Sequence, residues 1–120
     1  MIYTQAFVTL AAPQWDRSIA FYSQLLAQEP EGLQTDRYGA FDLGGWKLAI
    51  YRPKLEEQEP PAAYPTLSLC FQVPNLDETL VYLATLNMED PGPIQQVSHG
   101  REVYLYDPDG NRIILYEPRK

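Results

Sequence analysis

The sequence contains an internal repeat, and this repeat restricts the fold more than any other feature. When the chain is aligned with itself at an offset of 61 residues, Asp16 matches Asp77 and several apolar positions around it match as well. At an offset of 65, residues 45–53 match residues 110–118, and each stretch combines a leading glycine with alternating apolar positions. Self-similarity at a fixed spacing indicates a duplicated structural unit. We therefore interpret the 120 residues as two copies of one small unit.

Each copy is predicted to contain a strand, a helix and three further strands. Alternating apolar positions predict the strands, and apolar positions spaced by three or four residues predict the helices. Gly44-Gly45 marks a tight hairpin turn, and Asn75 followed by Glu78 resembles a capping box at a helix start. The expected strands are 3–11, 32–35, 38–43, 46–52, 66–73, 94–98, 101–106 and 111–117, and the expected helices are 14–28 and 76–86.

This order of elements predicts an α+β fold built from two βαβββ modules. The modules cover about 1–53 and about 65–118 of a single domain, 1–120, and the proline-rich stretch at about 54–64 is expected to link them. The hydrophobic share of 45% and the charged share of 21% are ordinary for a globular protein.

Charge and cysteine content exclude several classes of protein. Nine Lys and Arg against sixteen Asp and Glu give a net charge of −7, which would repel a phosphate backbone, so no nucleic-acid partner is expected. Cys70 is the only cysteine, so neither an internal disulfide nor a multi-cysteine metal site can form.

Residues 1–5 lack the pattern of an export signal, and no stretch approaches the about 20 apolar residues of a membrane span. We expect a cytoplasmic protein with no membrane partner.

The predicted strands carry two different rows of side chains, because successive residues of a strand point to opposite faces. One row is almost purely apolar, for example Leu48 with Ile50 and Ile113 with Leu115, and is expected to meet the helices. The other row is rich in tyrosine and polar groups, which suits a half-solvated surface that holds a ligand. Two alternatives are a solvent-facing sheet and a face buried against a second subunit. The candidate ligand-binding residues are Thr9, Phe41, Lys47, Tyr51, Ser68, Cys70, Gln72, Tyr104, Tyr106, Arg112 and Tyr116.

Two stretches resemble a known family. They are the run from Phe7-Val8-Thr9-Leu10 to Phe21-Tyr22, and the ending at 106–117 with its Asp107-Pro108-Asp109-Gly110-Asn111 turn. Both resemble the vicinal oxygen chelate superfamily, which includes glyoxalase I, bleomycin resistance proteins and extradiol dioxygenases. The resemblance covers essentially the whole chain and implies paired βαβββ modules, with curved mixed sheets around a cup and the helices outside. It also implies a homodimer.

The resemblance further implies four metal ligands, from the first and last strands of each module. The corresponding positions here are Phe7, Ala49, Ser68 and Ile114. Phe, Ala and Ile carry no donor atom and a serine hydroxyl is a poor neutral ligand, so no metal or other cofactor is expected. The sequence thus favours a metal-independent protein of the bleomycin resistance type that binds an amphipathic or aromatic small molecule. The alternatives are a glyoxalase-like lyase or isomerase with displaced or absent metal ligands, and a dimerisation or regulatory module with a vestigial cup.

A few polar residues have two interpretations each. His99 is either a solvated turn residue or a general acid or base, and Cys70 is either a small partly buried residue or a nucleophile. Asp107 and Asp109 indicate turn chemistry or a weak cation site. Lys47 and Arg112 occupy equivalent places in the repeats and either extend into solvent or clamp a carboxylate or phosphate. That pair favours an anionic ligand, whereas the acidic net charge favours a cationic one, so the sequence leaves the ligand charge open.

Overall fold

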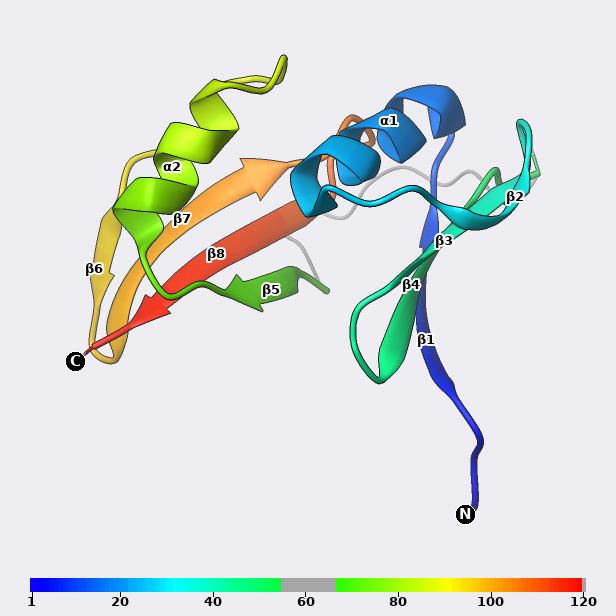
Figure 1. Ribbon diagram of the computed structural model, residues 1–120, viewed down its shortest axis with the longest axis horizontal. Coiled ribbons are helices and arrows are strands. Elements are labelled where there is room, and N and C mark those ends of the chain that lie inside the picture. The colour runs from blue at the N-terminus through cyan, green and yellow to red at the C-terminus, as the bar shows by residue number, and fades with distance from the viewer. Residues whose placement is uncertain (55–66, 120) are drawn as a thin grey trace. The chain divides into compact units, whose positions relative to one another are not determined.

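The computed structural model describes residues 1–54 and 67–119, and the chain divides into two compact units, 1–60 and 61–120. In its described part, each unit contains one helix and one four-stranded sheet (Figure 1). The linker predicted at about 54–64 lies, apart from Lys54, outside the described residues. The module boundaries and the shared cup stay predictions.

Unit 1 (1–60) follows the predicted order of elements. It comprises β1 (Ala6–Ala11), α1 (Trp15–Leu26), β2 (Glu31–Gln34), β3 (Tyr38–Asp42) and β4 (Trp46–Tyr51). The strands lie in the order β1-β4-β3-β2, with β1 parallel to β4 and the other pairs antiparallel. At the β3–β4 turn, Gly44 and Gly45 have φ angles of 76° and 106°, which the two-residue hairpin turn requires and glycine adopts without strain.

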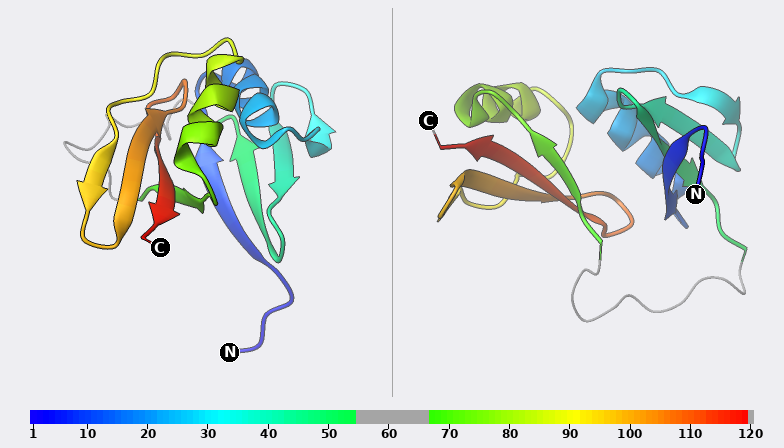
Figure 2. Two further views of the ribbon diagram at one scale, coloured as in Figure 1. Left: turned by 60° about the vertical axis from the view of Figure 1, so that its left-hand side comes forward. Right: turned by 90° about the horizontal axis from the view of Figure 1, so that it is seen from below.

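The core of unit 1 forms where α1 lies against one face of its sheet (Figure 2). The fully buried Tyr22 of α1 packs against Phe41 of β3, with ring centroids 6.5 Å apart. The indole N–H of Trp15 donates a 3.2 Å hydrogen bond to the backbone oxygen of Ile50. Leu48 and Ile50 of β4 are fully buried on the same side. The helix-facing row therefore supplies the hydrophobic core, as the sequence predicted.

Unit 2 (61–120) repeats this arrangement. It comprises β5 (Leu69–Gln72), α2 (Leu76–Ala84), β6 (Gln95–Val97), β7 (Gly100–Tyr106) and β8 (Arg112–Pro118), with the strand order β5-β8-β7-β6. Strand β5 is parallel to β8, as β1 is to β4. The predicted cap of α2 is confirmed, because Oδ1 of Asn75 accepts a 3.0 Å hydrogen bond from the backbone N–H of Glu78. The α+β fold with two βαβββ modules is thus confirmed.

Strands β1 and β5 each begin three residues later than predicted. Strand β1 begins at Ala6 because its partner β4 begins at Trp46, directly after the hairpin turn. Strand β5 begins at Leu69, and Leu67, two residues before it, is 61% exposed. Within residues 1–54 and 67–119, no helix is both long and apolar enough to cross a membrane.

Candidate functional site

The face of the unit 2 sheet that points away from α2 carries most of the predicted ligand-binding residues. The register places Cys70 opposite Ile114 and Ile114 opposite Tyr104, while their chain neighbours Ile113 and Leu115 are buried on the helix side. Alternation then assigns the rest of this face. We call it the tyrosine face, and its residues are Ser68, Cys70, Gln72, Glu102, Tyr104, Tyr106, Arg112, Ile114 and Tyr116.

A chain of contacts orders the polar groups of the tyrosine face. Nε of Arg112 donates a 2.9 Å hydrogen bond to Oγ of Ser68, and Cζ of Arg112 lies 4.9 Å from the ring centroid of Tyr104. The phenol of Tyr104 donates a 2.9 Å hydrogen bond to Oε1 of Glu102. This hydrogen bond is the main reason why the pKa of Tyr104 is raised above its ordinary value. The phenol is therefore a hydrogen-bond donor near neutral pH, and the sequence prediction had omitted its acceptor Glu102.

Tyr116 and His99 meet at the other end of the tyrosine face. The phenol of Tyr116 donates a 3.1 Å hydrogen bond to the backbone oxygen of His99, and the two rings lie 5.1 Å apart. The imidazole is exposed, and its Nδ1 lies 3.4 Å from Oγ of Ser98. Its position in the turn before β7 agrees with the solvated-turn interpretation, and a general acid or base role stays a prediction.

Cys70 lies on the tyrosine face with an exposed side chain. Partial burial, together with the negative charge of Glu102, raises the pKa of its thiol above the ordinary value. A raised pKa favours the thiol over the nucleophilic thiolate. These surroundings suit a small contact residue better than a nucleophile.

The corresponding face of unit 1 carries Thr9, Lys47 and Tyr51. Thr9 lies opposite Ala49, and Tyr51 lies opposite Tyr38. The ammonium of Lys47 forms an ion pair with the carboxylate of Glu31. The hydrogen bond within this pair is the main cause of the raised pKa of Lys47. Lys47 therefore has an acidic partner inside its own sheet. The ligand-binding roles of these residues stay predictions.

The placement of Phe41 in the tyrosine-rich row is wrong. Strand pairing puts Phe41 directly opposite Leu48, and residues opposite each other in a sheet share a face. Phe41 is 0% exposed and packs against Tyr22 of α1. It belongs to the hydrophobic core of unit 1.

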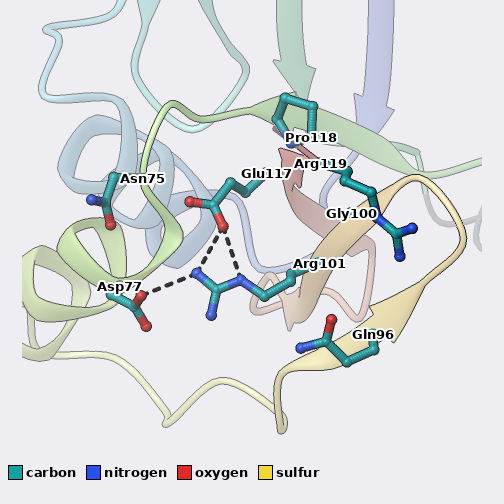
Figure 3. A pocket seen from close by; sticks show the side chains of 8 residues that line it. All are labelled: Asn75, Asp77, Gln96, Gly100, Arg101, Glu117, Pro118 and Arg119. Atoms are coloured by element: carbon teal, nitrogen blue, oxygen red, sulfur yellow. Dashed lines mark hydrogen bonds and ion pairs between the residues drawn. The ribbon is translucent and has the colours of Figure 1, made fainter.

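A hollow of about 370 Å³ lies on the helix side of the unit 2 sheet. Figure 3 shows the guanidinium of Arg101 between Asp77 of α2 and Glu117 of β8. Its Nη2 lies 3.0 Å from Asp77 and 2.7 Å from Glu117, and its Nε donates a 2.9 Å hydrogen bond to Glu117. Oε1 of Glu117 also accepts a hydrogen bond from the backbone N–H of Leu76. The pKa of Glu117 is lowered, mainly by the hydrogen bond from Arg101 and to a smaller extent by the hydrogen bond from Leu76. These contacts fasten α2 to its sheet.

Sequence reasoning missed this hollow. The pairing of Arg101 with Glu117 depends on the β7–β8 register, which the sequence did not supply. Asp77 could have been anticipated, because the first turn of a helix favours acidic residues.

Comparison with known proteins identifies the family. The family model described as Glyoxalase/Bleomycin resistance protein/Dioxygenase superfamily matches residues 4–115. The chain belongs to this superfamily. The resemblance inferred from the sequence is thereby confirmed. No curated protein matches the chain significantly by sequence.

Solved structures of similar proteins share the superfamily fold. A lactoylglutathione lyase from Agrobacterium tumefaciens is 21% identical with a TM-score of 0.73, covering 95% of this chain and 92% of that one. A glyoxalase / bleomycin resistance protein from Catenulispora acidiphila is 23% identical with a TM-score of 0.73, covering 98% and 100%. TnmS3, an antibiotic binding protein from Streptomyces sp. CB03234, is 16% identical with a TM-score of 0.72, covering 98% of both chains. At these identities the likeness establishes the fold alone.

The metal positions implied for metal-using members of the superfamily do not fit a divalent ion here. Phe7 lies on β1, Ala49 on β4 and Ile114 on β8, and none of them has a donor atom. The hydroxyl of Ser68 already accepts the hydrogen bond from Arg112. In the parts of the chain that the structure describes, no group of three or more His, Cys, Asp or Glu side chains could hold a metal.

The carboxylate of Asp107 serves the turn between β7 and β8. It accepts hydrogen bonds from the backbone N–H of Asp109 at 2.9 Å and of Asn111 at 2.8 Å, and from the side-chain amide of Asn111 at 2.9 Å. These contacts agree with turn chemistry, the first of the two interpretations of this motif.

Proposed function

We propose that this chain is a metal-independent small-molecule binding protein of the glyoxalase/bleomycin resistance type. Its ligand is an amphipathic or aromatic compound that lies on the tyrosine face. The observation that carries this proposal is the contact chain from Ser68 through Arg112 and Tyr104 to Glu102. It orders a cation, a phenol ring and a carboxylate on a face that the hydrophobic core does not use. Aromatic faces with a few fixed polar groups are typical of small-molecule sites.

The fold and the residues at the implied metal positions both support this proposal. The antibiotic binding protein TnmS3 has the same fold, so the scaffold is compatible with binding a compound. Phe7, Ala49 and Ile114 cannot coordinate a metal, so a metal-activated reaction is a poorer match to this chain than binding is.

Replacement of Tyr104 by alanine is expected to weaken binding of an aromatic ligand by about two- to tenfold, because it removes one aromatic contact. Wild-type protein should first be screened with naphthalene derivatives, with fluorescence quenching and the melting temperature as readouts. A true ligand at a hundredfold excess over its Kd adds about 2.7 kcal/mol to the free energy of unfolding. Tyr3→Ala is the control, since Tyr3 is 69% exposed and precedes β1. Equal weakening by both variants contradicts the proposed site.

Native mass spectrometry of protein purified from its own cell is expected to give a homodimer without a stoichiometric divalent metal. The dimer is proposed because shallow sheets of two small modules leave faces that a second copy can close. Zinc, nickel, iron or manganese near one per subunit would favour the lyase or isomerase alternative, and a persistent monomer would contradict the dimer.

We also propose a cytoplasmic location, which suits a chain whose only cysteine is Cys70.

A further inference from the structure

Contacts at the tyrosine face determine which ligand charge it favours. The net charge of −7 by itself favours a cation. That charge is a sum over the whole chain, and the effect of an exposed charge is screened beyond about 8 Å at physiological ionic strength. The affinity of a bound ligand depends most strongly on the charged side chains that it contacts. The ligand charge that the face favours therefore depends on which of these side chains already have a partner of opposite charge.

Most cationic side chains on the two sheets already have acidic partners. Lys47 is paired with Glu31, and Arg101 is paired with Asp77 and Glu117. Arg112 differs, because no carboxylate of residues 1–54 and 67–119 lies within ion-pair distance of its guanidinium. Its positive charge is therefore the one that a ligand on the tyrosine face can neutralise.

The guanidinium of Arg112 is held in place without being neutralised. The hydroxyl of Ser68 binds Nε at 2.9 Å, and the ring of Tyr104 lies under Cζ at 4.9 Å. Both contacts leave the two terminal amino groups free of hydrogen bonds to the described residues. Two parallel N–H groups match the two oxygens of a carboxylate or the edge of a phosphate, and a pre-ordered side chain loses little entropy on binding.

Glu102 carries the opposite charge further along the same face, since it lies opposite Tyr116 whereas Arg112 lies opposite Tyr106. Its Oε1 accepts the hydrogen bond from Tyr104, so this phenol lies beside the carboxylate. Apart from Ser68, the side chains beside Arg112 are apolar or aromatic, since Tyr106 lies directly opposite it and Ile114 follows on the same face. A flat apolar body can rest on these side chains while its charged group meets the arginine.

We propose, on the basis of the proposed function, that the tyrosine face selects an oxyanion attached to a planar apolar body, with Arg112 as the anion-binding residue. Tyr104 and Ser68 are positioning residues for the guanidinium. The acidic net charge then slows the approach of the ligand and leaves its contacts unchanged.

Three probes that share one ring system test this proposal on the full chain by titration calorimetry. They are 2-naphthoate, 2-naphthylmethanol and 2-naphthylmethylammonium. We expect 2-naphthoate to bind about tenfold or more tightly than the alcohol, because it gains a charge-assisted hydrogen-bond pair. Arg112→Gln should abolish this preference and leave the affinity for the alcohol within about twofold. Arg112→Lys keeps the positive charge but lacks the two parallel N–H groups of the guanidinium, so it should retain only part of the preference for 2-naphthoate. Arg17→Gln, on the exposed side of α1, is the matched control and should change neither affinity.

The outcomes separate the two proposals. Equal affinity for the three probes, or a preference for the ammonium, overturns the anion selectivity and leaves the binding function intact. Retention of the 2-naphthoate preference in a folded Arg112→Gln protein also overturns it. If none of the probes binds and a wider aromatic library also fails, the proposed function fails together with the inference that rests on it.

Discussion

Replacement of Phe41 by alanine is expected to lower the free energy of unfolding by about 3–5 kcal/mol. The ring is 0% exposed and fills the space between β3 and Tyr22 of α1, so its removal leaves a cavity in the core of unit 1. Denaturant titration measures this loss as a shift in the unfolding midpoint. Phe41→Leu keeps most of the buried volume and should cost much less, about 1 kcal/mol.

Phe7 provides a matched control for this prediction, because it is the same residue type on the other face of the same sheet. It lies opposite Lys47 and is 47% exposed, so Phe7→Ala should cost about 1 kcal/mol or less. If Phe41→Ala unfolds the protein no more easily than Phe7→Ala but abolishes ligand binding, Phe41 belongs to the ligand-binding surface after all.

Strand order along the chain could be predicted from the sequence because alternation and turn residues are local signals. The same signals could also have placed Phe41 correctly. A two-residue turn at Gly44-Gly45 makes Leu43 and Trp46 the first facing pair, and the N–H of Leu43 donates to the oxygen of Trp46 at 2.9 Å. Two residues further from the turn on each strand, the pairing reaches Phe41 and Leu48. The alternation within 38–43 alone did not show which residues face the helix, because the segment is too short for its pattern to distinguish the two faces.

The polar contacts of the site could be predicted only in part. Arg112 and Tyr104 were both assigned to one row, but the hydrogen bond between Arg112 and Ser68 depends on the parallel pairing of β5 with β8, which brings together two residues 44 positions apart in the chain. Glu102 was missed, although it stands two residues before Tyr104 and therefore on the same face. The ion pair of Lys47 with Glu31 reaches from β4 past β3 to β2, whose register is irregular, so sequence spacing could not indicate it.

Gly100→Ala is expected to destabilise unit 2 by about 3 kcal/mol or more, because the strand pairing leaves no room for a side chain. A Cβ at this position would lie 2.1 Å from the backbone oxygen of Glu117 and 3.0 Å from Cα of Pro118. These are backbone atoms of the neighbouring strand β8, so the clash cannot be relieved by a rotamer change. Thermal unfolding followed by circular dichroism measures the loss.

The substitution should also disturb the His99 end of the tyrosine face, because Gly100 holds the turn that presents the backbone oxygen of His99. That oxygen accepts hydrogen bonds from the phenol of Tyr116 at 3.1 Å and from the N–H of Arg119 at 2.8 Å. Gly92→Ala is the control in the same unit, since a Cβ there meets its nearest atom, the backbone oxygen of Tyr104, at an ordinary 3.7 Å. A Gly100→Ala protein as stable as Gly92→Ala would mean that β7 and β8 separate at this end, and the hydrogen bond between Tyr116 and His99 would then not define the edge of the site.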